Sequence, residues 1–280
     1  MIELRDLTKK FGDFTAVDGL DLTIETGEFF GLLGPNGAGK TTTISMLSTV
    51  LLPTSGQILI DGKRLDRKAS AEKRKLSVIT QEYSMRQDMT MDEVMEYQGR
   101  LYYMKKKEIR EKSAQLLEFA GLADYRHRVV RHLSGGMKRK LMICRALMTE
   151  PEILLLDEPT AGMDAISRRQ MWNLLRQLHG RGITILLTTH YIDEAQSLCE
   201  RVALIDKGRL DTVDTPESLI DALGPFTVET SSEEELVCRY FRTRQEAIEY
   251  LPQAGRQAIL RNTTLEDVFV ERIGRRIDQK

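Results

Sequence analysis

The chain has 280 residues and a mass of 32.0 kDa, enough for one large domain with a small appendage or for two modest domains. Its 41% hydrophobic and 30% charged residues exclude an intrinsically disordered protein, and its formal net charge of −1 argues against a nucleic-acid-binding protein that depends on a global positive field. No stretch approaches the roughly 18 apolar residues of a membrane-spanning helix, and the N-terminus lacks the apolar stretch of a signal peptide. Cys144, Cys199 and Cys238 are scattered, so we expect reduced thiols in a cytoplasmic protein.

Along most of the chain, predicted strands alternate with predicted helices. Short strands are expected within residues 2–30, with a buried strand at 29–33 and a helical segment at 44–52 that Pro53 ends. Beyond these the pattern predicts a hairpin around Asp61-Gly62, helices within 90–122 and 137–149, strands at 153–157 and 183–189, a helix at 165–179, a helix from Ile192, a hairpin at Lys207-Gly208 and a helix from Pro216. This alternation predicts an α/β fold with a mostly parallel sheet and crossover helices.

The pattern changes at Gly224-Pro225, and we place a boundary near residue 223. Two strand-like segments, a helix at 243–251 and a last helix capped by Thr264 follow. We therefore predict a main domain at 1–222 and a small α+β extension at 223–280. An apolar stripe on the last helix is expected either to dock on the main domain or to help two chains dimerise; it is formed by Leu265, Val268, Phe269 and Ile273.

The stretch GPNGAGKT at 34–41 matches the phosphate-binding pattern G-x-x-x-x-G-K-[ST]. It comprises Gly34, Pro35, Asn36, Gly37, Ala38, Gly39, Lys40 and Thr41. Glycines let successive backbone N–H groups point inward at phosphate oxygens, and the following helix presents its positive N-terminal end to the same anion. Lys40 is expected to reach the β- and γ-phosphates, and the Thr41 hydroxyl to hold Mg²⁺. A glycine-rich turn with a surface lysine is the alternative, but the position between a buried strand and a helix favours nucleotide binding.

Two carboxylates and a histidine follow buried strands at the sheet edge where ligands bind in open α/β folds. Asp157 and Glu158 end the strand at 153–157, and His190 follows the strand at 183–189. We expect Asp157 to hold a metal ion through Thr41 or a water. Glu158 is placed to orient or deprotonate an attacking water, and His190 to contact the γ-phosphate. Taken alone, each of these residues is more typical of a solvated turn or a packed side chain.

A further motif, LSGGM at 133–137, precedes a helix rich in lysine and arginine. With this motif the chain resembles the ATP-binding-cassette (ABC) ATPases, whose signature is LSGGQ. The resemblance covers about residues 2–222 and rests on six elements in the family's order: the loop at 34–41, Gln81, the signature at 133–137, Asp157-Glu158, AGMD at 161–164, and His190. Met137 departs from the family's glutamine, but the Ser134 hydroxyl and the Gly135 and Gly136 N–H groups still form an anion site at a helix N-terminus, so activity is expected.

The resemblance implies an ABC-type P-loop NTPase with a RecA-like, mostly parallel sheet, an N-terminal antiparallel β-subdomain and an inserted helical subdomain at about 82–148. It implies ATP and Mg²⁺ as cofactors, with Thr41, Gln81 and Asp157 toward the metal and Lys40, Gln81, Glu158 and His190 in catalysis. The nucleotide contacts it implies are Phe11, residues 34–41, Thr42, Ser134, Gly135, Gly136 and Asp164. Phe11 would stack on adenine, with an ordinary packed aromatic as the alternative. In the family, Ser134 completes the γ-phosphate site of a second cassette, so two chains sandwich two ATP molecules.

One cassette without a membrane segment implies separate permease subunits and a peripheral position on the inner face of the cell membrane. LSGGM, AGMD and the closing TLEDVFVERIG resemble ABC-2-type exporters; an importer ATPase and a soluble iron–sulfur assembly ATPase are the alternatives. Residues 81–104 are rich in methionine and tyrosine, which suits either a docking surface or the core of the helical subdomain. The partners expected are therefore an ABC-2-type permease and a second copy or a homologous cassette, and no nucleic acid.

Overall fold

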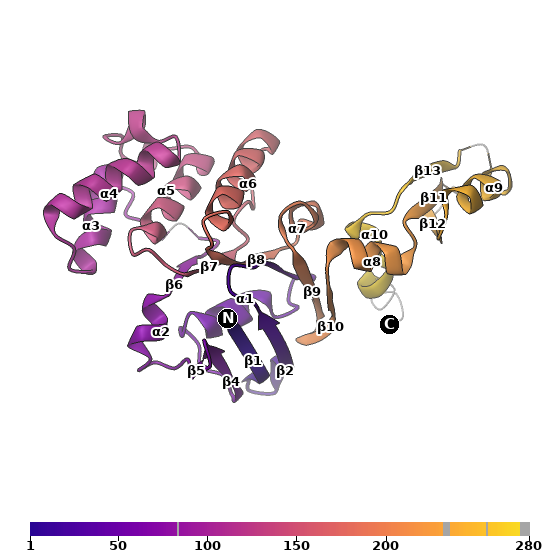
Figure 1. The fold of residues 1–280 in the computed structure, drawn as a ribbon, viewed down its shortest axis with the longest axis horizontal. Helices are drawn as coiled ribbons and strands as arrows, with labels where there is room; N and C mark the ends of the chain where they lie inside the picture. The colour runs from indigo at the N-terminus through magenta and orange to yellow at the C-terminus, as the bar shows by residue number, and fades with distance from the viewer. Residues whose placement is uncertain (83, 232–235, 256, 275–280) are drawn as a thin grey trace.

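The structure, a computed structural model, describes residues 1–82, 84–231, 236–255 and 257–274. Its centre is a six-stranded sheet in the order β10-β9-β3-β8-β7-β6, in which only β10 runs antiparallel to its neighbour (Figure 1). The strands are β3 (Phe29–Leu33), β6 (Leu76–Ile79), β7 (Ile153–Asp157), β8 (Thr184–Thr189), β9 (Arg201–Asp206) and β10 (Arg209–Asp214). The predicted α/β fold with a mostly parallel sheet is confirmed.

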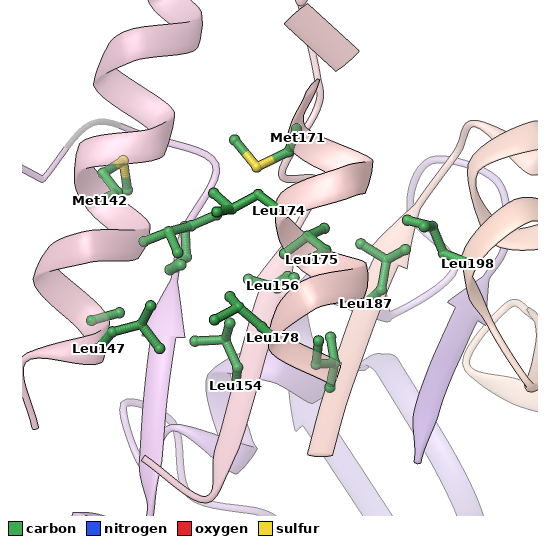
Figure 2. Packing of buried hydrophobic residues seen from close by; sticks show 14 of the residues in the cluster. Met142, Leu147, Leu154, Leu156, Met171, Leu174, Leu175, Leu178, Leu187 and Leu198 are labelled. Atoms are coloured by element: carbon green, nitrogen blue, oxygen red, sulfur yellow. The ribbon is translucent and has the colours of Figure 1, made fainter. Parts of the chain in front are cut away.

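The central strands are buried on both faces, which explains their continuous apolar sequences. Successive side chains of a strand point to opposite faces, so β7 places Leu154 and Leu156 in one hydrophobic cluster and Ile153 and Leu155 in another. Figure 2 shows the first cluster, where side chains of α5 (Gly135–Leu147) and α6 (Ala165–His179) meet those of the sheet. This two-sided packing fixes the strand ends, and with them the turns that follow.

The second cluster lies under an antiparallel sheet of order β2-β1-β4-β5. Its strands are β1 (Ile2–Phe11), β2 (Phe14–Ile24), β4 (Ser55–Ile60) and β5 (Lys63–Arg64), and α1 (Lys40–Leu47) packs on the same side. Helix α1 ends at Leu47, earlier than the 44–52 segment predicted, because Thr49 adopts a left-handed backbone conformation (φ 59°). The predicted hairpin at Asp61-Gly62 joins β4 to β5.

The helical subdomain is an insertion between β6 and β7 that lies on the other side of the sheet (Figure 1). It contains α3 (Met91–Leu101), α4 (Lys106–Phe119), the 3₁₀ turns η1 (Ala123–Tyr125) and η2 (Val130–His132), and α5. The helical pattern predicted within residues 90–122 thus corresponds to two separate helices, α3 and α4. Helix α3 ends in a left-handed turn at Tyr103 (φ 58°), where the Met104 N–H donates to Gly99 O and the Tyr103 N–H to Arg100 O.

The methionines and tyrosines of residues 81–104 differ in how deeply they are buried. Met85, Met91 and Met95 are buried in the core of the helical subdomain. Tyr97 and Tyr102 are about half exposed, and Tyr103 is 96% exposed. Met89 and Met104 are partly buried against the same core, and Tyr83 lies outside the described residues. The methionines therefore have the packing role, whereas the three described tyrosines face solvent.

The C-terminal residues form a three-stranded antiparallel sheet, β12-β11-β13, with three helices beside it. The elements are α8 (Pro216–Leu223), β11 (Phe226–Ser231), β12 (Leu236–Phe241), α9 (Arg244–Ala254), β13 (Ile259–Asn262) and α10 (Leu265–Ile273). Helix α10 buries Leu265, Val268 and Ile273 against α8 and α7 (Ile192–Leu198), and the Leu265 N–H donates to Gln196 Oε1 at 2.8 Å. The apolar stripe of the last helix thus docks on its own chain.

Among the described residues, five elements have no counterpart in the sequence prediction: α2 (Ser70–Arg74), β6, β13 and the 3₁₀ turns η1 and η2. None of the described helices is long and apolar enough to cross a membrane. Cys144 and Cys199 are buried and Cys238 is partly buried, and all three are free thiols. The domain boundary near residue 223 stays a prediction.

Candidate nucleotide site

The glycine-rich loop joins the buried strand β3 directly to α1. Two of its glycines are required by close backbone contacts. A Cβ on Gly34 would lie 2.4 Å from the carbonyl oxygen of Ile205, and one on Gly39, which has a φ of +104°, would lie 2.5 Å from that of Ala16. The loop is therefore held between β9 and β2, with the N-terminus of α1 following it immediately.

Lys40 is the first residue of α1 and is only 5% exposed. Its Nζ donates to the carbonyl oxygens of Gly34 (2.7 Å) and Pro35 (3.1 Å). Burial lowers the pKa of Lys40, and the carboxylates of Glu158 and Asp157 act in the opposite direction. A buried cation held by two loop carbonyls is placed to exchange them for phosphate oxygens.

Asp157, at the end of β7, lies against the first turn of α1. Its Oδ1 accepts hydrogen bonds from Thr41 Oγ1 at 3.2 Å and from Thr188 Oγ1 at 2.5 Å. The structure thus brings together the carboxylate and the hydroxyl that the sequence assigned to a metal ion.

Glu158 and His190 face each other across the edge of the sheet. His190 Nδ1 lies 3.1 Å from Glu158 Oε1, and the Glu158 N–H donates to Thr188 O at 3.0 Å. Glu158 has a left-handed backbone (φ 48°), which is strained for a side chain of its size. This turn aims the carboxylate away from the buried strand and toward the phosphate loop.

These groups line one cleft of about 520 Å³, which is large enough for a nucleotide. Its walls are Phe14, Ala16, Asn36, Gly37, Gly39, Lys40, Thr41, Thr42, Gln81, Glu158 and His190. Phe14, 63% exposed, is a wall residue that the sequence reasoning missed, although an aromatic residue beside Gly12-Asp13 was the available signal. Phe11 lies near by at the end of β1, does not line this cleft, and carries Lys9 Nζ 5.1 Å above its ring.

The loop that carries Gln81 is bound to α5 by two arginines, which the sequence reasoning also missed. Arg139, 2% exposed, donates from Nη1 to Thr80 O (2.7 Å) and from Nη2 to Gln81 O (3.0 Å). Arg145 donates to Ser84 O at 2.6 Å and to Ser84 Oγ at 2.8 Å. The position of Gln81 at the cleft therefore depends on the helix that begins with the LSGGM motif.

The signature residues do not line the cleft of their own chain. Ser134 is the N-cap of α5, where its hydroxyl accepts from the Met137 N–H at 3.2 Å, and Ser134 and Gly135 are exposed. Met137 packs partly against the core below. Asp164 is likewise an exposed N-cap, of α6, and its bonds from the Ser167 N–H and hydroxyl lower its pKa.

The donor set beside the phosphate loop fits Mg²⁺. A hydroxyl, a carboxylate and the amide of Gln81 offer only hard oxygen ligands, which Mg²⁺ prefers. Within the described residues, no group of three or more histidine, cysteine or acidic side chains gathers to hold a metal. The site therefore suits an ion that takes its remaining ligands from phosphate oxygens and water.

A family model, curated relatives and solved structures that are similar to this chain all describe the same kind of protein. A family model described as ABC transporter matches residues 17–161. The Nod factor export ATP-binding protein I of Cupriavidus metallidurans is 36% identical over 98% of both chains, and the daunorubicin resistance ATP-binding protein DrrA3 of Streptomyces coeruleorubidus is 37% identical over 95% of this chain and 93% of its own. A dimeric, post-hydrolysis ATP-binding cassette, MJ0796, bound to ADP and Pi, superposes with a TM-score of 0.69 at 28% identity, covering 77% of this chain and 98% of that one.

Proposed function

This chain belongs to the ABC transporter family, and from that premise we propose how its residues carry out ATP-driven export. The chain is the ATP-binding and ATP-hydrolysing subunit of an ABC exporter, since relatives that match nearly its full length are named for Nod factor export and daunorubicin resistance. These similarities favour export over import or iron–sulfur assembly. We assign the selection of the transported substrate to the membrane subunits.

The residue assignments rest on one observation, which is that five side chains from four separate segments line the same cleft. Lys40 and Thr41 come from α1, Gln81 from the loop after β6, Glu158 from the turn after β7, and His190 from the turn after β8. We assign Lys40 and the loop N–H groups to the β- and γ-phosphates of ATP. Thr41, Asp157 and Gln81 are assigned to Mg²⁺, which when bound neutralises charge on the phosphates.

Glu158 is the group assigned to the attacking water. Its carboxylate accepts a proton from the water as the water oxygen bonds to the γ-phosphorus, while the bond from that phosphorus to the β-phosphate oxygen breaks and ADP leaves. A ring N–H of His190 donates to the γ-phosphate oxygens. The His190–Glu158 contact at 3.1 Å keeps the two side chains at the same point of the cleft. Phe14 lines the cleft, and Phe11 pairs with it across the β1–β2 turn outside the lining, so Phe14 is the aromatic we assign to the base. Alanine at each position distinguishes the two through the KM for ATP.

The exposed tip of α5 supports a shared site. Ser134 and Gly135 lie at the N-terminus of a 13-residue helix, outside the cleft of their own chain, so they are accessible to the triphosphate of a second cassette. A two-fold dimer would close both clefts at once, and loss of the γ-phosphate would release the contact. The dimeric state of the similar cassette MJ0796 supports this arrangement.

The helical subdomain carries the surface we assign to the permease. Leu101, Tyr97, Tyr102 and Tyr103 are exposed at the end of α3, and exposed aromatics are typical of protein interfaces. Because α3 follows the Gln81 loop in the chain, a permease docked there would respond to the state of the cleft. The chain would then lie on the inner face of the cell membrane through an ABC-2-type permease.

An ATPase measurement on the purified chain, followed by capture from detergent-solubilised membranes, tests the proposal. Lys40→Ala should abolish hydrolysis and weaken nucleotide binding, and a polytopic membrane protein should be captured with the wild type. Tyr102→Ala with Tyr103→Ala should reduce that capture while leaving basal hydrolysis unchanged. Hydrolysis by Lys40→Ala at the wild-type rate would contradict the cleft assignment.

A further inference from the structure

A buried acidic side chain lies between the two turns that carry Glu158 and His190, outside the nucleotide cleft. Glu194 is in the first turn of α7, the helix that follows His190, and its side chain is 0% exposed. Its Oε1 accepts a hydrogen bond from Trp172 Nε1 of α6 at 3.0 Å. Within the described residues, its other oxygen, Oε2, is buried without a partner in hydrogen-bond geometry.

Two threonine hydroxyls from the functional turns are close to this carboxyl. Thr189 directly precedes His190, and its Oγ1 accepts from the Tyr191 N–H at 2.9 Å, which leaves the hydroxyl proton for donation. Thr160 lies two residues after Glu158 and is 1% exposed; its Oγ1 is also buried without a partner in the described part of the chain. Burial is the largest effect on the pKa of Glu194 and raises it, and both hydroxyls lie close enough to this carboxyl to act on it as well.

In the part of the chain that the structure describes, none of the groups that act on Glu194 is a cation. The charged group that acts on it is Asp193, which is also acidic and raises its pKa further. Arg168, the cation near by, lies 3.6 Å from Asp193 and over the ring of Tyr191. A buried carboxyl without a cation is more stable in its neutral form. The neutral form has an O–H group, which can donate a hydrogen bond to the unpaired Thr160 Oγ1.

We propose that Glu194 is a neutral acid whose two oxygens form hydrogen bonds with Trp172, Thr160 and Thr189. These bonds would hold the turns of Glu158 and His190 in the relative position that hydrolysis needs. One oxygen accepts from Trp172 and Thr189, and the O–H of the other donates to Thr160. Glu194 touches no nucleotide, so it is a positioning residue. The inference rests on the ATPase assignment of the cleft.

The test compares Glu194→Gln with Glu194→Leu. Glutamine is uncharged, has nearly the same shape and can both accept from Trp172 and donate to Thr160, whereas leucine can do neither. We expect the kcat of Glu194→Gln to stay within about threefold of the wild type and that of Glu194→Leu to fall about tenfold or more, with the KM for ATP unchanged in both. A Gln variant as impaired as the Leu variant would overturn the proposal, because a charge would then be required.

Trp172→Phe is the milder variant that keeps the proposal testable if Glu194→Leu fails to fold. It removes the Nε1–H donor and keeps an aromatic ring, so we expect kcat to fall about threefold to tenfold at unchanged KM; an unchanged kcat would count against the proposal. Glu158→Gln, measured in parallel, should lose activity although it makes the same chemical change. If the wild-type chain hydrolyses no ATP, it is the cleft assignment that fails.

Discussion

Gly34→Ala tests whether the phosphate loop works because of its exact fit against β9. The added Cβ would meet the carbonyl oxygen of Ile205 at 2.4 Å and the Ala38 Cβ at 2.9 Å. Since carbon atoms do not approach a backbone oxygen closer than about 3 Å, the loop must move by roughly half an ångström or more, and misplacement on the 1 Å scale costs about 10²-fold in rate. We expect kcat/KM to fall about tenfold to a hundredfold, with a loss of about 1–3 kcal/mol in unfolding free energy from overpacking.

The matched control is Gly62→Ala, in the β4–β5 turn. Gly62 has a φ of +74° and open space around its Cβ, so alanine there costs about 1–2 kcal/mol of backbone strain without touching the cleft. Steady-state ATP hydrolysis and thermal melting of both variants separate the two effects. The reasoning would be refuted if Gly34→Ala hydrolysed ATP like Gly62→Ala at similar stability.

Three further predictions concern other parts of the site and the fold. Glu158→Gln should slow hydrolysis by roughly 10²–10⁴ while leaving ATP binding intact, so that an ATP-bound dimer is seen by size-exclusion chromatography; near-normal turnover would contradict it. Arg139→Met removes the two bonds from Arg139 to Thr80 and Gln81 and keeps those from Arg145, so the Mg²⁺ concentration needed for half-maximal hydrolysis should rise severalfold with Mg²⁺-free ATP binding unchanged; an unaltered Mg²⁺ requirement would argue against this link. Bonds to Lys75 and the N-terminus lower the pKa of Asp61 to about 2, so its stabilisation is present above about pH 4 and lost as the pH falls toward 2; Asp61→Asn should flatten the melting temperature over that range, and an identical acid profile would count against it.

Periodicity and turn chemistry predicted most of the fold. The 165–179 helix has the predicted bounds, because Asp164 caps it and its apolar residues recur at helical spacing. The short strands β6 and β13 were missed, since their four residues show too little alternation to be distinguished from loop. The division at residues 102–105 was missed because a left-handed tyrosine, not a glycine or proline, ends α3.

The site could be predicted in part because motif residues occur at fixed spacing. Glu158, Gln81, His190 and most of the phosphate loop line one cleft, and Asp157 is hydrogen-bonded to Thr41 beside it, while their roles stay proposals. The contributions of Arg139 and Glu194 could not be predicted, because each acts through contacts between segments distant in the chain. A buried charge or acid appears in the sequence only as one polar residue on a helix, and its partners become visible only when the elements are packed.

The most direct test of the shared-site claim is a disulfide between two chains. In a background with Glu158→Gln and Cys238→Ser, one copy would carry Asn36→Cys in the phosphate loop and the other Ser134→Cys at the tip of α5. Oxidation should yield a product of twice the chain's mass on a non-reducing gel, formed with ATP and lost without it, because the nucleotide brings the two positions together. If only single chains are recovered with ATP present, the tip of one chain does not close the cleft of another, and the account is contradicted.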